Sequence, residues 1–146
     1  MTLPRPQRLF HSSPPGSLLK SADRGATAPA QDASEVSGVA YLSLVRSCPC
    51  LCCGMEPSEA AHVRMASAAH GKASGLQKKP HDKWALPLCA GCHRNEKHAQ
   101  HNQGEANFWC AIDISPLNVC EALWAKRDDL VAMRAVIFST ISQRGK

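Results

Sequence analysis

Residues 84–93 read Trp-Ala-Leu-Pro-Leu-Cys-Ala-Gly-Cys-His, a short apolar run followed at once by two cysteines. The run predicts an extended segment, and Pro87 favours a strand end or a sheet edge because proline has no N–H for the ladder. Cys89 and Cys92 have the two-residue spacing with which one tight turn presents two thiolates to one ion. The stretch therefore predicts a strand that leads into half of a metal site.

A second pair of cysteines supplies the other half. Cys50 and Cys53 have the same spacing, and Gly54 allows the backbone to turn its amides towards sulfur. Four thiolates complete a closed tetrahedral Zn²⁺ site of the structural type. Cys48 and Cys52 offer a competing spacing that zinc also permits, and we prefer Cys50 with Cys53 because of the glycine. Buried apolar cysteines and a redox-active pair are the alternative interpretations.

Length and composition exclude several classes of protein. A chain of 146 residues suits about one domain. The 17 Lys and Arg against 12 Asp and Glu give a mildly basic net charge of +5. Eight cysteines are too few for a disulfide scaffold, and no secretion signal precedes them. No apolar run approaches the ~18 residues of a membrane helix, so we expect neither a membrane protein nor a secreted mini-scaffold.

The chain divides by composition into three parts. Residues 1–40 are rich in Pro, Ser, Gly and Ala and lack apolar periodicity, so we expect a disordered segment. Residues 41–126 carry the cysteines and nearly all of the histidines and form the expected folded domain. Residues 127–146 are expected to form a C-terminal helix.

The hydrophobic pattern predicts a small α+β domain. Short strands are expected at 39–45, 61–64 and 84–88, with a long loop at 65–82. Helices are expected at 89–100, at 105–112, from Pro116 onwards with Ser115 as N-cap, and at 128–142. Cys110 and Cys120 fall in helical segments, and we expect both in the core.

Several motifs, read in order, resemble the HNH (ββα-metal) endonucleases. They are Glu59-Ala-Ala-His62-Val-Arg64, Lys79-Pro80-His-Asp82-Lys-Trp84-Ala-Leu-Pro87-Leu88-Cys89, Cys92-His93, Gln100-His101 and Glu105-Ala-Asn-Phe108-Trp109. Among these enzymes the chain is most similar to the phage-associated group of the Ref protein, the RecA-dependent nuclease of recombination enhancement. The resemblance covers roughly residues 47–125.

The resemblance implies a hairpin and a helix clasped by a structural Zn²⁺, and it implies roles for four residues. His62 would be the general base, with Asp82 serving in place of an Asn that HNH enzymes carry before the second cysteine pair. His93 and His101 would hold a catalytic divalent cation, Mg²⁺ or another. The implied partners are DNA and a RecA-type filament, and the implied location is the cytoplasm, for a bacterial or phage-encoded protein.

Three details limit the match. Many HNH enzymes have an acidic metal ligand just before the first His, where this chain has Ala61, and Trp84 occupies roughly the place of the missing Asn. His93 and His101 are far enough apart in sequence that a continuous helix would separate them by ~12 Å. They share an ion only if the helix bends or ends between them. His98, at ~7.5 Å along the same axis, is the competing candidate.

Phosphodiester hydrolysis needs these residue types. An imidazole is neutral enough near pH 7 to take a proton from water, and a divalent cation polarises the phosphoryl oxygen and steadies the leaving oxygen. Basic side chains near such a site could also meet phosphates without reading sequence, although a solvated loop accounts for them equally well. The basic residues in question are Arg64, Lys72, Lys78, Lys79 and Lys83.

The sequence therefore favours a divalent-metal-dependent DNA endonuclease with a general-base histidine. The first alternative is a non-catalytic, zinc-bound DNA-binding module of phage recombination or repair, and Ala61 is the residue that favours it. The second alternative is a redox protein. Two cysteine pairs outside a βαβ pattern suit zinc better than redox chemistry.

Overall fold

The computed structural model describes residues 38–73 and 79–144, all of them within one compact unit, Ser34–Lys146. The disorder expected of residues 1–40 lies outside the described residues, apart from the last three, which begin a helix. In chain order the elements are α1 (Gly38–Arg46), β1 (Glu59–His62), η1 (Ala68–His70), η2 (Asp82–Trp84), β2 (Ala85–Leu88), η3 (Gly91–Asn95), α2 (Gln100–Gln103), α3 (Glu105–Ala111), α4 (Pro116–Ala125) and α5 (Leu130–Gln143). The fold is of the mixed α and β class that the hydrophobic pattern predicts.

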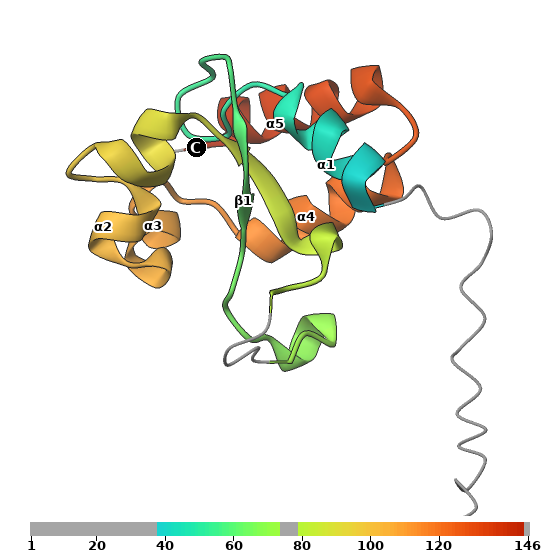
Figure 1. The fold of residues 1–146 in the computed structure, drawn as a ribbon. Helices are drawn as coiled ribbons and strands as arrows, with labels where there is room; N and C mark the ends of the chain where they lie inside the picture. Colours follow the sequence, from blue (N-terminus) through green and yellow to red (C-terminus); the bar gives the residue numbers. More distant parts are fainter. Residues whose placement is uncertain (1–37, 74–78, 145–146) are drawn as a thin grey trace, which may run out of the picture. The chain divides into compact units, whose positions relative to one another are not determined.

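The two strands form an antiparallel pair, in which Glu59 lies opposite Leu88 and His62 opposite Ala85. All four side chains of β2 are buried, as expected of its continuous apolar sequence. Helices α1 and α4 pack against β2. Figure 1 shows α1, α4 and α5 to one side of the hairpin and the short helices α2 and α3 to the other. The strands expected at 61–64 and 84–88 are confirmed, with slightly shifted ends.

The strand expected at 39–45 is wrong, because this segment lies in helix α1. Tyr41, Leu42 and Val45 are buried, and their spacing places them on one face of a helix. The short apolar run at 39–45 suggested a strand, but the Val39 side chain is exposed. Helix α1 contacts both strands of the hairpin. That tertiary contact decides its conformation, and seven residues of local pattern cannot reveal it.

The hydrophobic core lies between the hairpin and the helices α1, α3, α4 and α5. Trp109, Tyr41 and Phe108 are its largest fully buried side chains. Met133 and Ile137 of α5 are fully buried in the same cluster. The expected C-terminal helix is therefore an integral part of the domain. None of the described helices is both long enough and apolar enough to cross a membrane.

The last two helices begin where their sequence signals predict. Ser115 precedes α4 and Pro116 opens it, although the Ser115 hydroxyl makes no capping bond. Asp129 caps α5 by accepting a hydrogen bond from the N–H of Ala132 at 3.0 Å. Cys120 is buried as expected, whereas Cys110 is exposed, so its expected place in the core is wrong. In the short helix α3, the buried side chains are those of Phe108 and Trp109.

Candidate metal centre and histidine site

The four cysteines of the two pairs meet at one point. The Sγ atoms of Cys50, Cys53, Cys89 and Cys92 all lie within 4.8 Å of one another. The Sγ atoms of Cys53 and Cys89 are 3.6 Å apart. Tetrahedral Zn–S bonds of about 2.3 Å require sulfur atoms about 3.8 Å apart, so the donor set fits such an ion. The cluster is a candidate metal site, as the spacing of the cysteines predicts.

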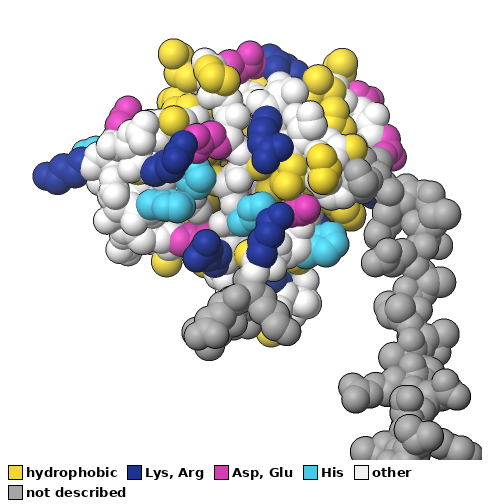
Figure 2. Space-filling view, viewed as in Figure 1, with side chains coloured by type: hydrophobic (Ala, Val, Ile, Leu, Met, Phe, Trp, Pro, Cys, Tyr) yellow, Lys and Arg dark blue, Asp and Glu magenta, His cyan; other side chains and the backbone are white. Residues whose placement is uncertain are grey.

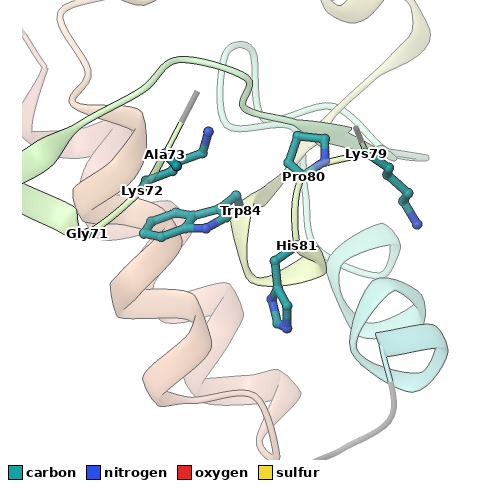
Figure 3. Close-up of a pocket in the computed structure, with 7 residues that line it drawn as sticks. All are labelled: Gly71, Lys72, Ala73, Lys79, Pro80, His81 and Trp84. Carbon is teal, nitrogen blue, oxygen red and sulfur yellow. The ribbon is translucent and has the colours of Figure 1, made fainter. Parts of the chain in front are cut away.

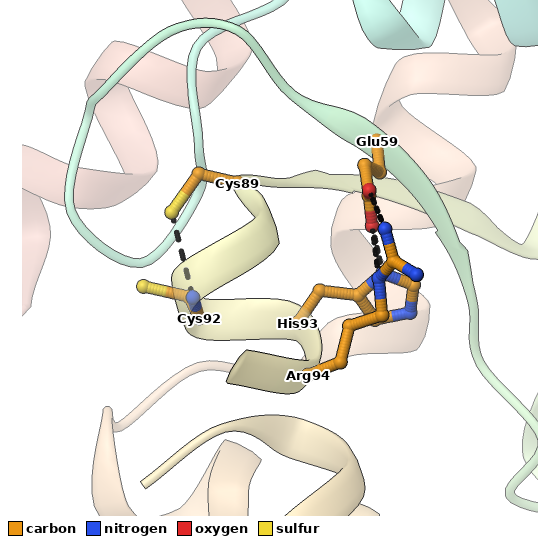
Figure 4. Close-up of polar contacts among 5 residues, drawn as sticks. All are labelled: Glu59, Cys89, Cys92, His93 and Arg94. Carbon is orange, nitrogen blue, oxygen red and sulfur yellow. Dashed lines mark hydrogen bonds and ion pairs between the residues drawn. The ribbon is translucent and has the colours of Figure 1, made fainter. Parts of the chain in front are cut away.

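Local backbone geometry explains why these two pairs converge. Gly54 has φ +75°, a left-handed conformation that favours glycine, and its N–H donates to the carbonyl of Cys50 at 2.7 Å. In the second pair, the N–H of Cys92 donates to Sγ of Cys89 at 3.5 Å (Figure 4). Burial raises the pKa of the Cys89 thiol, but this N–H and the neighbouring thiols outweigh it and hold that pKa below its usual value.

The competing pair does not form the cluster. Cys48 is fully buried in the hydrophobic core, and burial raises the pKa of its thiol to about 11. Cys52 is half-buried against the same core. The preference for Cys50 and Cys53, which rested on Gly54, is therefore confirmed by the geometry.

His62 and Asp82 lie side by side, although they are far apart in sequence. Nε2 of His62 is 2.9 Å from Oδ1 of Asp82, and the two side chains are only 17% and 21% exposed. Nζ of Lys79 donates to the same oxygen at 3.0 Å. Burial raises the pKa of the Asp82 carboxyl, but the bonds from His62 and Lys79 outweigh it and hold that pKa below its usual value.

This pairing fixes the protonation pattern of the His62 ring. An ionised carboxylate can only accept hydrogen bonds, so Nε2 of His62 must carry the proton that it donates to Asp82. In the neutral ring the lone pair is then left on Nδ1. In its neutral form the His62 ring thus has a defined acceptor nitrogen, Nδ1.

The second histidine group lies at the other end of β1. Nδ1 of His93 donates to Oε2 of Glu59 at 2.7 Å, and the Arg94 guanidinium binds the same carboxylate through Nε and Nη2 (Figure 4). The hydrogen bond from Arg94, followed by that from His93, lowers the pKa of the Glu59 carboxyl. Sequence reasoning quoted Glu59 in a motif but gave it no role. In the hairpin, Glu59 lies opposite Leu88, the residue before Cys89. Pairing the two expected strands in this register would have placed Glu59 near His93.

A break in the helix brings His93 and His101 together. The helix expected at 89–100 is wrong as a continuous element, because η3 ends at Asn95 and α2 begins at Gln100. The ring centroids of His93 and His101 are consequently 4.6 Å apart, nearly perpendicular to each other. His98 is exposed and does not join them, so the geometry favours His101 over His98 as the neighbour of His93.

Two side-chain amides stabilise this break. Nδ2 of Asn102 donates to the carbonyls of Arg94 and Glu96, at 3.0 and 2.7 Å. Nε2 of Gln103 donates to the carbonyl of His98 at 3.0 Å. Carbonyls at a helix end lack intrahelical partners, and the bond from Asn102 satisfies that of Arg94. The other two bonds hold the connection between η3 and α2.

Glu105 fastens the end of β1 to the short helices. Its carboxylate accepts hydrogen bonds from the backbone N–H groups of Arg64 and Met65 and from Nε2 of Gln100. This contact sets the Arg64 side chain near His101. Burial, followed by the charges of His93, Arg64 and Arg94, lowers the pKa of His101, so its imidazole is neutral near pH 7.

Within the described part of the chain, the four thiols are the one group of three or more candidate ligands whose donor atoms lie so close together. His93 and His101 are two neighbouring imidazoles outside that group. Figure 2 shows His side chains on one face of the molecule, interspersed with Lys, Arg, Asp and Glu. The two histidine pairs thus lie at opposite ends of one strand.

Two of the expected phosphate-binding lysines are engaged in the protein itself. Lys79 binds Asp82, as described above. The Lys83 ammonium lies 4.5 Å from the centroid of the Trp84 ring and 3.5 Å from Oε1 of Glu121. Lys83 is therefore a poor candidate for a phosphate contact.

The other three basic residues differ in their surroundings. Arg64 is exposed, and its guanidinium makes no ion pair within the described residues. Lys72 is buried, against the expectation of a solvated loop. Lys78 lies outside the described residues. Ala61, where many HNH enzymes have an acid, is fully buried in the core.

The fold and the site define a small mixed α and β protein with a four-cysteine cluster that could hold a metal ion. The chain belongs to the family described as "Protein of unknown function (DUF968)", which matches residues 30–115. It is also similar to "Uncharacterized protein YdfU" of Escherichia coli (strain K12), with 40% identity over 74 residues. That match covers 51% of this chain and 20% of the relative, so the chain corresponds to about a fifth of that protein's length. No solved structure matches the chain.

Proposed function

We propose that this chain is an HNH-type endonuclease that hydrolyses DNA phosphodiester bonds with a divalent cation. The observation that carries the proposal is the His62–Asp82 pair, with 2.9 Å between Nε2 and Oδ1. In the neutral form of this half-buried ring, the pairing leaves Nδ1 as a proton acceptor for water. General-base catalysis of this kind accounts for roughly 10²–10⁴-fold in rate.

The second histidine pair suits the cation. His93 and His101 would hold it. Nδ1 of His93 donates a hydrogen bond to Glu59, so in the neutral ring the lone pair that binds a metal ion is on Nε2. A bound divalent cation would polarise a phosphoryl oxygen and stabilise the leaving oxygen. Arg64 and Arg94 would add positive charge for the phosphate backbone.

The four-thiolate cluster has a different role in this proposal. Four cysteines leave no open position on a tetrahedral ion, so the ion would be structural Zn²⁺. It would fix the end of β2 and the start of η3, the segment that carries His93. The cluster thus supports the histidine site without taking part in the reaction.

A non-catalytic DNA-binding module is the second candidate. Buried Ala61 and the absence of a third close ligand beside His93 and His101, within the described residues, favour it. Both candidates would bind DNA, and only the first requires His62 and a divalent cation for a chemical step. The two are therefore separated by cleavage.

The deciding experiment is nicking of supercoiled plasmid by the purified protein with Mg²⁺ or Mn²⁺. We expect His62→Ala and His93→Ala to abolish nicking and His98→Ala, an exposed histidine outside both pairs, to retain it. Single-stranded and duplex DNA, with and without a RecA-type filament, belong in the same series. Equal nicking by wild type and His62→Ala, or no nicking under any of these conditions, would refute the nuclease.

A further inference from the structure

Lys72 is a buried ammonium without a carboxylate partner. Only 7% of the residue is exposed, and Nζ makes one hydrogen bond within the described residues, to the carbonyl of Met65 at 2.7 Å. The Trp84 ring centroid lies 6.0 Å from the same nitrogen. A buried cation is unfavourable unless it is paired, and an ammonium has three donors, so Lys72 is undersatisfied.

The turn between Ser67 and Lys72 does not require a charged side chain at position 72. The N–H of Ser67 donates to the carbonyl of Lys72, and the N–H of Lys72 donates to the carbonyl of Ser67, both at 2.9 Å. These two backbone bonds hold the turn whatever side chain stands at position 72. The turn therefore does not depend on the charged end of the Lys72 side chain.

The Lys72 side chain lines a pocket of about 230 Å³. Its walls are residues 71–73 and 79–81, with Trp84 on one side (Figure 3). No acidic residue lines the pocket, and none occurs in the sequence from 71 to 81. Nδ1 of His81 accepts from the N–H of Lys83 at 3.1 Å, which leaves Nε2 of that ring as a donor. Among the described residues, the pocket lining thus offers nitrogen donors and the Lys72 ammonium, and it contains no carboxylate.

The pocket adjoins the His62–Asp82 pair. The single turn η2 carries Asp82, which faces His62, and Trp84, which lines the pocket. Lys79 also lines the pocket, while its ammonium binds Asp82. The pocket and the His62–Asp82 pair are therefore joined by a single turn of the chain.

We propose that the Lys72 pocket binds a phosphate group of the DNA strand next to the one at His62. This inference rests on the proposed function for its substrate. Phosphate oxygens are strong acceptors that carry the missing counter-charge, and Lys is a common phosphate ligand. The contact would position the strand and would not read its sequence.

The first test measures DNA affinity against salt concentration in the His62→Ala background, in which the proposed cleavage cannot interfere. Lys72→Met keeps the length of the side chain and removes the charge. We expect it to weaken binding and to lower the slope of log affinity against log salt by about 1. Lys126→Met, an exposed lysine without an ion pair among the described residues, changes the net charge equally and should leave the slope unaltered.

The second test follows the indole N–H resonance of Trp84, assigned with Trp84→Phe, as inorganic phosphate or a short oligonucleotide is added. We expect a saturable shift with both in the wild-type protein, and none in Lys72→Met. Metal content and thermal melting show whether Lys72→Met is folded; if it is not, the wild-type titration decides alone.

The outcomes separate the pocket from the nuclease. An unchanged salt slope in folded Lys72→Met overturns the proposal that the pocket binds a DNA phosphate. So does the absence of a saturable Trp84 shift with the oligonucleotide, even if inorganic phosphate alone shifts the resonance. If the Lys72 effects appear but the wild-type protein never nicks DNA, the catalytic proposal fails. The pocket then stands as a strand-binding site of a non-catalytic module.

Discussion

At the scale of single residues, carboxylates set the state of the histidines. Asp82 holds Nε2 of His62, and Glu59 holds Nδ1 of His93, so the two rings present opposite nitrogens. Both carboxyls have a lowered pKa and therefore remain acceptors near pH 7. The tautomer of each imidazole is thus determined by a neighbour that lies in another part of the sequence.

Glu59 gives a prediction at this scale. Glu59→Ala should weaken binding of Mn²⁺ or Co²⁺ at His93 by about 10–100-fold, because an unsupported imidazole loses its orientation and tautomer. Glu59→Gln, which keeps an acceptor oxygen, should lose much less. Calorimetric titration of protein whose cysteine cluster is already loaded measures both. Equal affinity for wild type and Glu59→Ala would contradict this role.

At the scale of elements, the break between η3 and α2 matters most for the site. It replaces a separation of ~12 Å along a continuous helix with rings 4.6 Å apart. Glu96 and Ala99 have extended backbone conformations, which end one helix and precede the next. No glycine or proline lies between Asn95 and Gln100, so no helix-breaking residue in the sequence indicated where the helix ends.

Asn102 gives the prediction for this element. Asn102→Ala removes two hydrogen bonds to helix-end carbonyls and should lower the free energy of unfolding by about 1–2 kcal/mol. It should also weaken binding of a divalent cation to His93 and His101. Asn107→Ala, which removes one exposed bond to the carbonyl of Gln103, is the matched control and should have little effect on either quantity. Urea unfolding and metal titration distinguish the two variants.

At the scale of the whole molecule, the four-thiol cluster adds a second link between two segments that already meet in the core. Cys50 and Cys53 follow α1, whereas Cys89 and Cys92 connect β2 to η3. The two strands are only four residues each, and a two-stranded sheet of this size is marginal by itself. A metal ion held by all four thiolates would lock the hairpin to the helical segment that carries His93.

The cluster gives the prediction at this scale. We expect one tightly bound zinc ion per chain in reduced protein, and we expect Cys50→Ser to lose it and to melt at a markedly lower temperature. Cys110→Ser, an exposed cysteine outside the cluster, should retain both metal and melting temperature. Metal analysis and thermal unfolding provide the readouts. Reduced wild-type protein without bound metal would show that the cysteines have another role.

The sequence by itself determined the features that depend on local chemistry. The spacing of the cysteines and Gly54 identified the four members of the cluster, and the apolar run at 84–88 located β2. Ser115 with Pro116 marked the start of α4. These signals are local, because a tight turn, a strand and a helix start each depend on a few consecutive residues.

The tertiary structure decided what depends on contacts between distant segments. It made α1 a helix by packing it across the hairpin, and it ended η3 so that His93 meets His101. It also buried Lys72 and placed Asp82 against His62. The physical reason is that the burial, the hydrogen-bond partner and the tautomer of a side chain are set by whatever packs against it, and spacing along the chain does not contain that information.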